Sequence, residues 1–228
     1  MNDVRMIEVK EDILADNTRI AEGVRLRLRD TKTLLLNLMS SPGSGKTSLI
    51  LRTIEGLQGA VKLGVIEADI DSKVDAEKVA AAGIPAVQLR TGGFCHLDAT
   101  MVTQGIDALP AQRLDLIIIE NVGNLVCPAE FDTGAHKNVM ILSVPEGDDK
   151  PLKYPLIFQR CGAMIVNKTD VLPYFDFDLD KVTEFARQRN PGMQIFPISA
   201  KTGEGVEALA AWICAQICKE KEKKETRL

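Results

Sequence analysis

The stretch LLLNLMSSPGSGKTS at residues 34–48 decides the fold of this chain. Its first five residues include four leucines, which is typical of a strand buried on both faces. The serine, proline and glycine residues that follow predict a turn, and Gly45-Lys46-Thr47 closes it. A buried strand, a glycine-rich turn and a Lys-Thr pair in this order predict a phosphate-binding loop that opens onto a helix.

The residues of this loop have separate expected roles. Glycines allow successive backbone N–H groups to turn inward on a phosphate, and the helix adds its positive end. Lys46 is expected to bridge the β- and γ-phosphates, and the Thr47 hydroxyl to hold Mg²⁺. The first glycine of the usual pattern is Ser40 here. The expected nucleotide-binding residues of the loop are Gly43, Ser44, Gly45, Lys46, Thr47 and Ser48.

Length and composition are those of an ordinary α/β enzyme. The 228 residues fit one domain, and a net charge of −4 disfavours a general nucleic-acid or membrane surface. No apolar run approaches the ~20 residues of a membrane-spanning helix, and the first residues lack a signal-peptide core. We therefore expect a cytoplasmic protein. Five cysteines at irregular spacings argue against a disulfide framework.

Acidic residues end two of the expected strands. The strand at 61–68 leads into Asp69, and the apolar strand that starts the stretch 115–128 ends in Glu120. Ligands of open α/β sheets bind beyond the carboxyl ends of the strands, so both carboxylates are expected to reach Mg²⁺ directly or through water. The expected catalytic residues are Lys46, Asp69 and Glu120. The expected magnesium ligands are Thr47, Asp69 and Glu120.

Three neighbouring residues complete this part of the expected site. Gly123 is expected to offer a backbone N–H to the γ-phosphate. Asp71 or Ser72 is expected to cap the helix over 73–83. The alternatives are that Asp69 is itself a cap and that Glu120 is a solvated carboxylate at a strand end.

A tetrapeptide, Asn167-Lys168-Thr169-Asp170, predicts which base is bound. The carboxylate at 170 can accept from both N1–H and the 2-amino group of guanine, whereas adenine has no donor in either place. The Lys168 stem can lie along the ring. About 30 residues later a strand at 193–198 ends in Ser-Ala-Lys, where backbone groups can meet guanine O6. The expected base-binding residues are Asn167, Lys168, Asp170, Ser199, Ala200 and Lys201.

The rest of the chain reads as one domain with two short additions. Helices are expected at 9–29, 46–57 and 205–219, and further strands at 84–89, 139–144 and 163–172. The first helix carries Ile13, Leu14, Ile20, Val24 and Leu28 and is expected to pack on the sheet or on another subunit. We predict an N-terminal helical extension (1–30), a P-loop GTPase domain (31–219) and a solvated charged tail (220–228).

Cys95-His96 and Cys127 form a candidate metal site. Both segments follow elements on the ligand side of the expected sheet, so proximity in space is plausible. Two thiolates and an imidazole suit Zn²⁺ or Ni²⁺, and three protein ligands leave one position open for transfer. The alternative is that these are packing residues, because buried cysteines are common. Cys161, Cys214 and Cys218 are expected to be ordinary core or surface thiols.

Six motifs in this order resemble one known family. LMSSPGSGKT, EADIDSKVDAEK, GFCHLDA, IIIENVGNLVCP, EGDDKPLKYP and NKTDVLPY are similar to the HypB family of nickel-incorporation GTPases of hydrogenase maturation, over about residues 34–205. The resemblance implies a SIMIBI-type P-loop fold and explains Ser40. It also implies that Lys46 and Thr47 bind phosphate and Mg²⁺, that Asp170 reads guanine, and that Cys95, His96 and Cys127 bind metal at the interface of a nucleotide-dependent homodimer.

The resemblance implies a metallochaperone that binds GTP or GDP, Mg²⁺ and Ni²⁺ or Zn²⁺. Its expected partners are a second copy of the chain, a nickel-binding accessory protein and the hydrogenase large subunit. Cys127 lies seven residues beyond Glu120, so movement of a loop that senses the γ-phosphate would move a metal ligand. Hydrolysis is expected to be slow, because no Gln or Arg stands out to position water or neutralise the transition state.

Two other function classes share parts of this pattern. A regulatory GTPase switch would use every nucleotide motif, with Cys95 and Cys127 merely structural. A P-loop kinase for a small molecule is disfavoured by the guanine-reading motif and by the absence of a lid-like arginine cluster. Lys150, in the polar turn expected at 145–151, is interpreted either as a phosphate contact across a dimer or as a surface charge.

Overall fold

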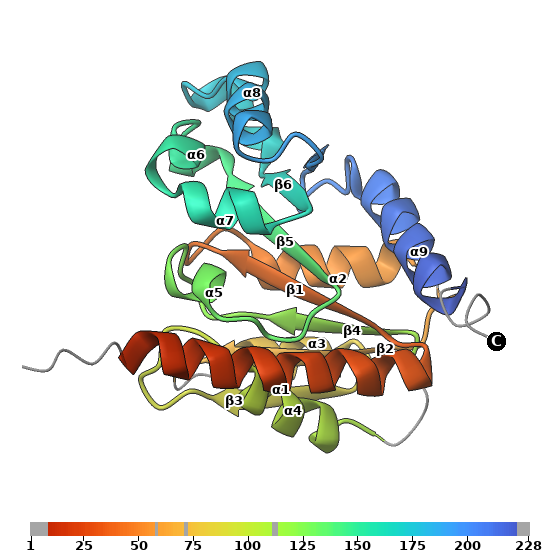
Figure 1. Cartoon of the computed structure of the whole chain (residues 1–228). Coiled ribbons are helices and arrows are strands. Elements are labelled where there is room, and N and C mark those ends of the chain that lie inside the picture. The colour runs from red at the N-terminus through yellow and green to blue at the C-terminus, as the bar shows by residue number, and fades with distance from the viewer. Residues whose placement is uncertain (1–8, 58, 71–72, 111–113, 223–228) are drawn as a thin grey trace, which may run out of the picture.

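The computed structural model describes residues 9–57, 59–70, 73–110 and 114–222. Its strands form one parallel sheet in the order β3-β2-β4-β1-β5-β6-β7, with helices on both faces (Figure 1). The strands are β1 (Leu34–Ser40), β2 (Leu63–Asp69), β3 (Ala86–Arg90), β4 (Leu116–Glu120), β5 (Lys137–Ser143), β6 (Ala163–Asn167) and β7 (Gln194–Pro197). The predicted fold class is confirmed, and the strand that decided it lies at the centre of the sheet.

The α-helices are α1 (Val9–Thr31), α2 (Lys46–Gly56), α3 (Val74–Ala81), α4 (Ala99–Ala108), α5 (Cys127–Glu130), α6 (Lys150–Lys153), α7 (Pro155–Arg160), α8 (Leu179–Arg189) and α9 (Val206–Glu222). Helices α1, α2, α3 and α9 follow the predictions, whereas no helix was predicted where α5 to α8 lie. Helices α5 to α7 are four to six residues long, too short to show a helical period. Helix α8 is strongly polar and buries only Val182 and Ala186.

Two stretches take a conformation other than the predicted one. The strand expected over 163–172 ends at Asn167, and a 3-10 helix, η2 (Thr169–Tyr174), follows it. The polar turn expected at 145–151 contains a second 3-10 helix, η1 (Val144–Glu146), and the start of α6. In η1 the Glu146 side chain accepts from the backbone N–H and the hydroxyl of Ser143, a local capping box that favours helical geometry.

Alternating side chains of the strands build a core on each face of the sheet. Leu34, Leu36 and Leu38 of β1 pack with apolar residues of α2 and α9. Leu35 faces the other way, into a cluster with α1 and α4. A third cluster, which includes Met39, joins the same face to α7 and α8. Because β1 is buried on both faces, its carboxyl end can hold the loop that follows in a fixed place.

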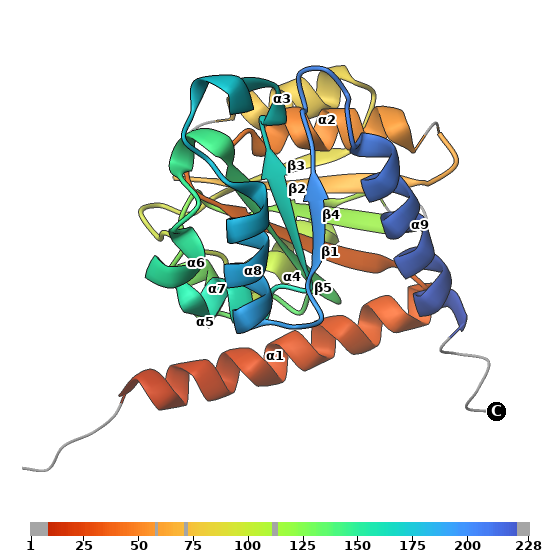
Figure 2. The same ribbon diagram turned by 90° about the horizontal axis from the view of Figure 1, so that it is seen from above.

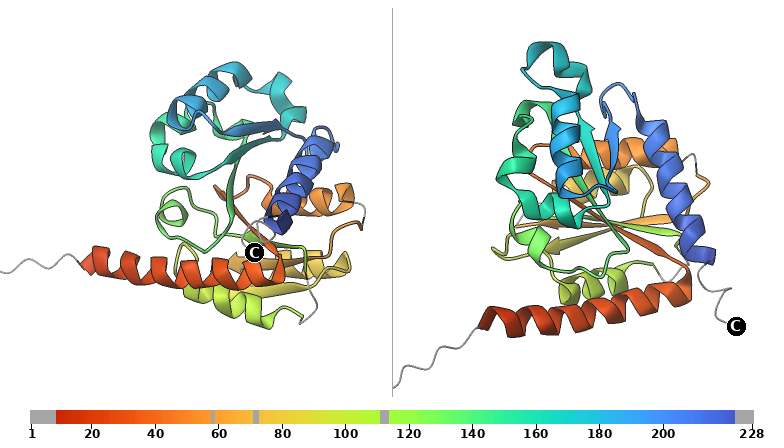
Figure 3. Two further views of the ribbon diagram at one scale, coloured as in Figure 1. Left: turned by 45° about the vertical axis from the view of Figure 1, so that its right-hand side comes forward. Right: turned by 45° about the horizontal axis from the view of Figure 1, so that its top comes forward.

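Helix α1 packs on α4 along one face of the sheet (Figure 2). Its buried stripe consists of Asn17, Ala21, Val24 and Leu28. Ile20, expected on the apolar stripe, is instead 36% exposed, because the helix turns Asn17 and Ala21 toward the domain. Both views of Figure 3 show the N-terminal end of α1 projecting beyond the sheet.

The C-terminal helix reaches further than predicted. Helix α9 continues through Glu222, into the segment expected to be a solvated tail. Glu220 is buried, and Lys221 Nζ lies 2.7 Å from Asp115 Oδ1. The proposed cap residues Asp71 and Ser72 lie outside the described residues; α3 begins after Lys73, with no side-chain cap. The chain division at 30 and 220 stays a prediction.

Candidate functional site

The loop between β1 and α2 turns at two glycines and is tied together by side chains. Gly43 and Gly45 have φ angles of 74° and 95°, the left-handed region that glycine adopts without strain. A Cβ at Gly45 would lie 2.6 Å from Asn167 Nδ2. Ser40 Oγ accepts from Lys46 Nζ at 3.1 Å and from Ser44 Oγ at 2.7 Å. The serine that replaces the first glycine thus supplies a hydroxyl that ties the lysine and the loop together.

The segment after β6 meets both the phosphate loop and the loop after β7. Asn167 Nδ2 donates to Ser44 O at 2.9 Å, and its Oδ1 accepts from Ala200 N at 3.1 Å. Both polar groups of Asn167 are therefore engaged by protein atoms, and its side chain joins the two loops. Lys168 Nζ donates to Gly43 O at 2.7 Å, which lays the lysine stem across the loop.

The carboxylate predicted to read the base is held in place. Asp170 Oδ1 accepts from Ser199 Oγ at 2.7 Å, and Lys201 Nζ lies 3.9 Å from Oδ2. From the other side, Arg52 of α2 donates to Ala200 O at 2.9 Å and to Lys201 O at 3.1 Å. The predicted base-binding residues thus come together around one point, although they are up to 34 positions apart in the chain.

A buried pair of carboxyl groups lies beside the phosphate loop. Glu67 of β2 stands opposite Glu120 of β4 in the sheet, and the two residues are 2% and 5% exposed. Thr47 Oγ1 donates to Glu120 Oε1 at 3.1 Å. Glu67 Oε1 and Glu120 Oε2 have no hydrogen-bond partner among the described residues. The sequence reasoning missed Glu67; the signal available was an acidic residue inside an otherwise apolar strand.

Burial dominates the protonation of this pair. Loss of water raises the pKa of Glu67 to about 10, and the neighbouring Glu120 adds to the shift. Burial also raises the pKa of Glu120, against the opposing effects of the bond with Glu67 and of the Lys46 charge. In the nucleotide-free chain the pair therefore retains a proton at neutral pH.

These groups line a cavity of about 280 Å³ next to the phosphate loop. Asp69, at the end of β2, is exposed at its edge. A hydroxyl, buried carboxylate oxygens without partners and a lysine suit a hydrated Mg²⁺ with phosphate, because Mg²⁺ prefers oxygen ligands. The residues predicted to hold magnesium therefore fit that ion. They are Asp69 and Glu120 of the cavity wall and Thr47, which contacts Glu120; Glu67 and Asp75 also lie on the wall.

The structure brings Cys95, His96 and Cys127 together, and their ligand atoms lie within 4.8 Å of one another. The first two lie between β3 and α4, and Cys127 opens α5. His96 stacks on Phe131 at 3.8 Å between ring centroids. Burial lowers the pKa of His96, which keeps its imidazole neutral and able to bind a metal. Interaction with Cys95 raises the pKa of the Cys127 thiol, so metal uptake must displace protons.

The loop after β4 connects the carboxylate pair to this cluster. Asn121, fully buried, accepts at Oδ1 from Leu97 N at 3.2 Å. Asn124 Nδ2 lies 3.4 Å from Cys95 O, and its Oδ1 accepts from Val126 N at 2.9 Å. The loop thus begins at Glu120, beside Thr47, holds the Cys95-His96 segment through two asparagines, and ends at Cys127.

Comparison with known proteins identifies the family. Residues 34–197 match the CobW/HypB/UreG nucleotide-binding domain. The hydrogenase maturation factor HypB of Escherichia coli K12 is 47% identical over 218 residues, which are 96% of this chain and 75% of the relative. The chain belongs to the HypB family. The predicted family is thereby confirmed, and with it a nucleotide-binding P-loop protein of hydrogenase maturation.

Two solved HypB structures share this fold. That of Helicobacter pylori, in complex with nickel, has a TM-score of 0.85 at 35% identity and covers 90% of this chain and 97% of its own. That of Archaeoglobus fulgidus has a TM-score of 0.82 at 39% identity and covers 90% and 100%. The match covers nearly all of each of these two solved chains. The similarity therefore extends beyond the nucleotide motifs to the whole architecture.

The remaining predicted residues lie apart from the cluster. Lys150 starts α6, with its Nζ 5.6 Å from the Tyr154 ring centre. Among the described residues Cys161 is buried, Cys214 is half-buried and Cys218 is exposed, and all three thiols are free. No helix in the described part of the chain is long and apolar enough to cross a membrane.

Proposed function

We propose that this chain is a GTP-hydrolysing metallochaperone that couples its nucleotide state to Ni²⁺ or Zn²⁺ binding and delivers nickel during hydrogenase maturation. One observation supports this most strongly: the loop 120–127 runs from a carboxylate bonded to Thr47 to the thiol of Cys127. The nickel complex of the Helicobacter pylori HypB supports nickel as the metal. The proposed setting is the cytoplasm, with a homodimer, a nickel-binding accessory protein and the hydrogenase large subunit as partners.

The nucleotide half of the function follows from the site residues. The loop N–H groups and Lys46 would hold the phosphates, and Asp170 would accept from guanine N1–H and the 2-amino group. Thr47, Glu120 and Asp69 would hold Mg²⁺, which when bound neutralises charge on the β- and γ-phosphates. Glu120 would exchange its bond to Thr47 for a role beside that ion. Hydrolysis would be slow, since the described residues around the cavity include no arginine.

The coupling step is a movement of the loop after β4. A γ-phosphate that draws Glu120 and Gly123 toward the phosphate loop would pull Asn121 and Cys127 with them. Because Asn121 also holds Leu97, His96 would move in the same step. Metal affinity and nucleotide state must then be linked reciprocally.

A parallel titration with Ni²⁺ and Zn²⁺ tests this function. Purified protein is loaded with GDP or with a non-hydrolysable GTP analogue, and affinity and stoichiometry are recorded. A shift of tenfold or more, about 1.4 kcal/mol of coupling, is expected. Cys127→Ala is expected to abolish the shift and weaken metal binding. Cys218→Ala removes an exposed thiol of α9 and is the control, with unchanged binding.

Two outcomes contradict the proposal. Equal metal affinity in the GDP-bound and GTP-analogue-bound states would show that nucleotide and metal binding are not coupled. Unchanged metal binding and unchanged GTP turnover in Cys127→Ala would show that Cys127 is not part of a metal site. Absence of metal binding would favour a regulatory GTPase switch, in which Cys95 and Cys127 are packing residues; that alternative shares every nucleotide contact described above.

Gly123→Ala tests the proposed movement of the loop after β4 separately. A Cβ at this position would lie 3.0 Å from Cα and N of Pro42, so the loop must shift away from the phosphate loop. We expect GTP turnover to fall about tenfold, because small displacements at a reacting centre have large effects on rate, while GDP affinity changes less than about twofold. Gly162→Ala, where a Cβ meets nothing within 4 Å, is the matched control. Normal turnover in Gly123→Ala would exclude this loop as the γ-phosphate sensor.

A further inference from the structure

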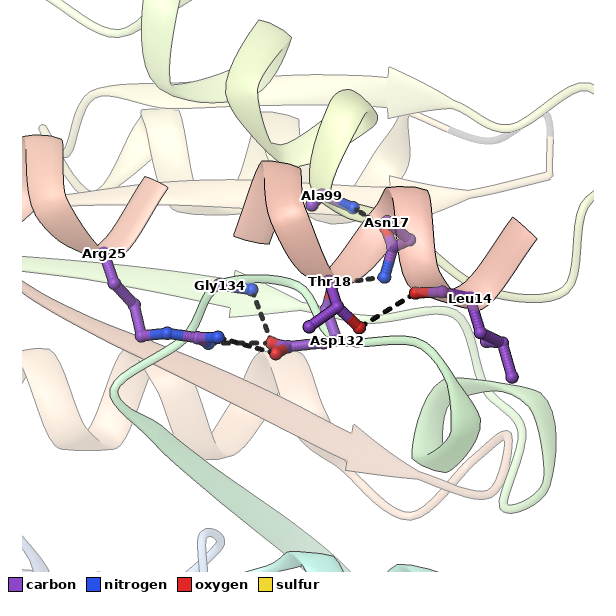
Figure 4. A network of polar contacts seen from close by, with 7 residues as sticks. All are labelled: Leu14, Asn17, Thr18, Arg25, Ala99, Asp132 and Gly134. Atoms are coloured by element: carbon purple, nitrogen blue, oxygen red, sulfur yellow. Dashed lines mark hydrogen bonds and ion pairs between the residues drawn. The ribbon is translucent and has the colours of Figure 1, made fainter. Parts of the chain in front are cut away.

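We propose that Asn17 of α1 is a positioning residue that sets the geometry of the Cys95, His96 and Cys127 site. Figure 4 shows its side chain between Ala99 and Asp132, two residues from different parts of the chain. The proposal rests on the metal-binding role proposed above and extends it to a helix outside the motifs that carry the nucleotide chemistry.

The Asn17 carboxamide bonds both metal-bearing segments at once. Ala99 N donates to Asn17 Oδ1 at 2.8 Å, three residues after His96. Asn17 Nδ2 donates to Asp132 O at 2.9 Å, five residues after Cys127. Since both bonds go to backbone atoms, the side chain fixes the separation of the two chain segments that carry the ligands.

The burial of Asn17 calls for this explanation. It lies 7% exposed on the stripe of α1 that is otherwise made of Ala21, Val24 and Leu28. A polar side chain on such a stripe is unfavourable unless its groups are bonded. Here both groups are bonded, and both partners belong to metal-bearing segments. An apolar residue would leave Ala99 N and Asp132 O without these bonds and would remove the link that α1 makes between the two segments.

The rest of α1 holds Asn17 in place. Arg25 donates to both carboxylate oxygens of Asp132, at 2.9 and 2.7 Å (Figure 4). A Cβ at Gly134 would lie 2.7 Å from Val24 Cβ, so the helix and the segment after α5 are in close contact. The metal cluster is thus held from two sides: Asn121 and the loop after β4 on the nucleotide side, and Asn17 on the side of α1.

Asn17→Ala in the full chain tests the proposal, with Ni²⁺ alone as the probe. We expect the Ni²⁺ dissociation constant to rise about tenfold or more, as for residues that orient metal ligands. The thiolate-to-nickel charge-transfer spectrum should change in position or intensity. GDP affinity should stay within about twofold, because the hydrogen-bond partners of Asn17, Ala99 and Asp132, lie outside the nucleotide-binding residues described above. Asn17→Ser, with a shorter side chain, is measured in parallel in case Asn17→Ala does not fold.

Two controls separate positioning from stability. Thr18→Ala removes a hydroxyl that bonds only Leu14 O within the exposed face of α1, and it should bind Ni²⁺ like the natural chain. Leu28→Ala removes a buried contact of α1 eleven residues along the helix from Asn17; its melting temperature should fall while its Ni²⁺ spectrum stays unchanged.

Three results would overturn the inference. The first is an unchanged Ni²⁺ affinity and spectrum in Asn17→Ala. The second is an unchanged Ni²⁺ affinity and spectrum in Asn17→Ser, if Asn17→Ala does not fold. The third is a loss of Ni²⁺ affinity in Leu28→Ala as large as that in Asn17→Ala. A natural chain that binds no Ni²⁺ would instead overturn the proposed function, so the two failures are distinguishable.

Discussion

Asp170→Asn is expected to turn a guanine-specific site into one that prefers xanthine. The carboxylate can accept from N1–H and from the 2-amino group, and an asparagine side chain can accept only one of these bonds. Xanthine carries an oxygen in place of the amino group, so the asparagine NH₂ can donate to it. For guanine, the substitution replaces two charge-assisted hydrogen bonds by one uncharged hydrogen bond. We therefore expect GTP affinity to fall by at least about 100-fold.

Nucleotide titration with GDP and with xanthosine diphosphate measures this change. The neighbouring contacts keep residue 170 in place, because Ser199 Oγ donates to Asp170 Oδ1 and an asparagine oxygen can accept the same bond. Lys201→Ala is a suitable control: its ammonium lies 3.9 Å from the carboxylate and is mostly exposed, so a modest effect is expected. Retention of GDP affinity in Asp170→Asn would show that the base is read elsewhere.

Glu67→Gln is expected to stabilise the nucleotide-free protein, increasingly so as pH rises. The pKa of Glu67 is raised to about 10 by burial beside Glu120, whereas in the unfolded chain it returns to its ordinary value. Above its ordinary pKa, Glu67 loses its proton in the unfolded chain but keeps it in the folded chain. Its contribution to the free energy of unfolding is therefore complete below the unfolded pKa and is lost as pH rises toward 10. A glutamine side chain is neutral in both states and has no such loss.

We expect the variant to gain at least about 2 kcal/mol at pH 8, which corresponds to roughly 4–8 °C in melting temperature for a chain of this size. The difference should shrink toward pH 5. Thermal unfolding in the absence of nucleotide, from pH 5 to pH 9, measures it. Glu204→Gln, on an exposed loop, is the control and should change little. A constant difference across this range would contradict a shared buried proton.

The nucleotide chemistry was predictable because it lies in short, contiguous motifs. Lys46 follows its glycine directly, and a carboxylate three residues after Asn167 can read the base whatever the rest of the chain does. The central strand was equally clear, since a run of leucines is compatible with burial on both faces. Local spacing is sufficient where the residues that act together are neighbours in sequence.

Other parts of the site depend on which strands lie side by side. Glu67 was not singled out from the sequence, because its partner Glu120 lies opposite it only once β2 is placed next to β4. Helices α5 to α7 were missed because four to six residues are too few to show a helical period, and α8 was missed because it is strongly polar. Ile20 was assigned to the buried stripe from hydrophobicity, whereas the partner groups on Ala99 and Asp132 select Asn17 instead.

By itself the sequence determined the parallel α/β fold, and it predicted the phosphate loop and the residues expected to read guanine, because each is encoded by adjacent side chains and by hydrophobic periodicity. Only the tertiary structure decided that Cys95, His96 and Cys127 meet, that two carboxyl groups share a buried site, and that Asn17 links the metal-bearing segments. Those relations join chain segments from 31 to 115 positions apart, and only strand order and helix packing bring them together.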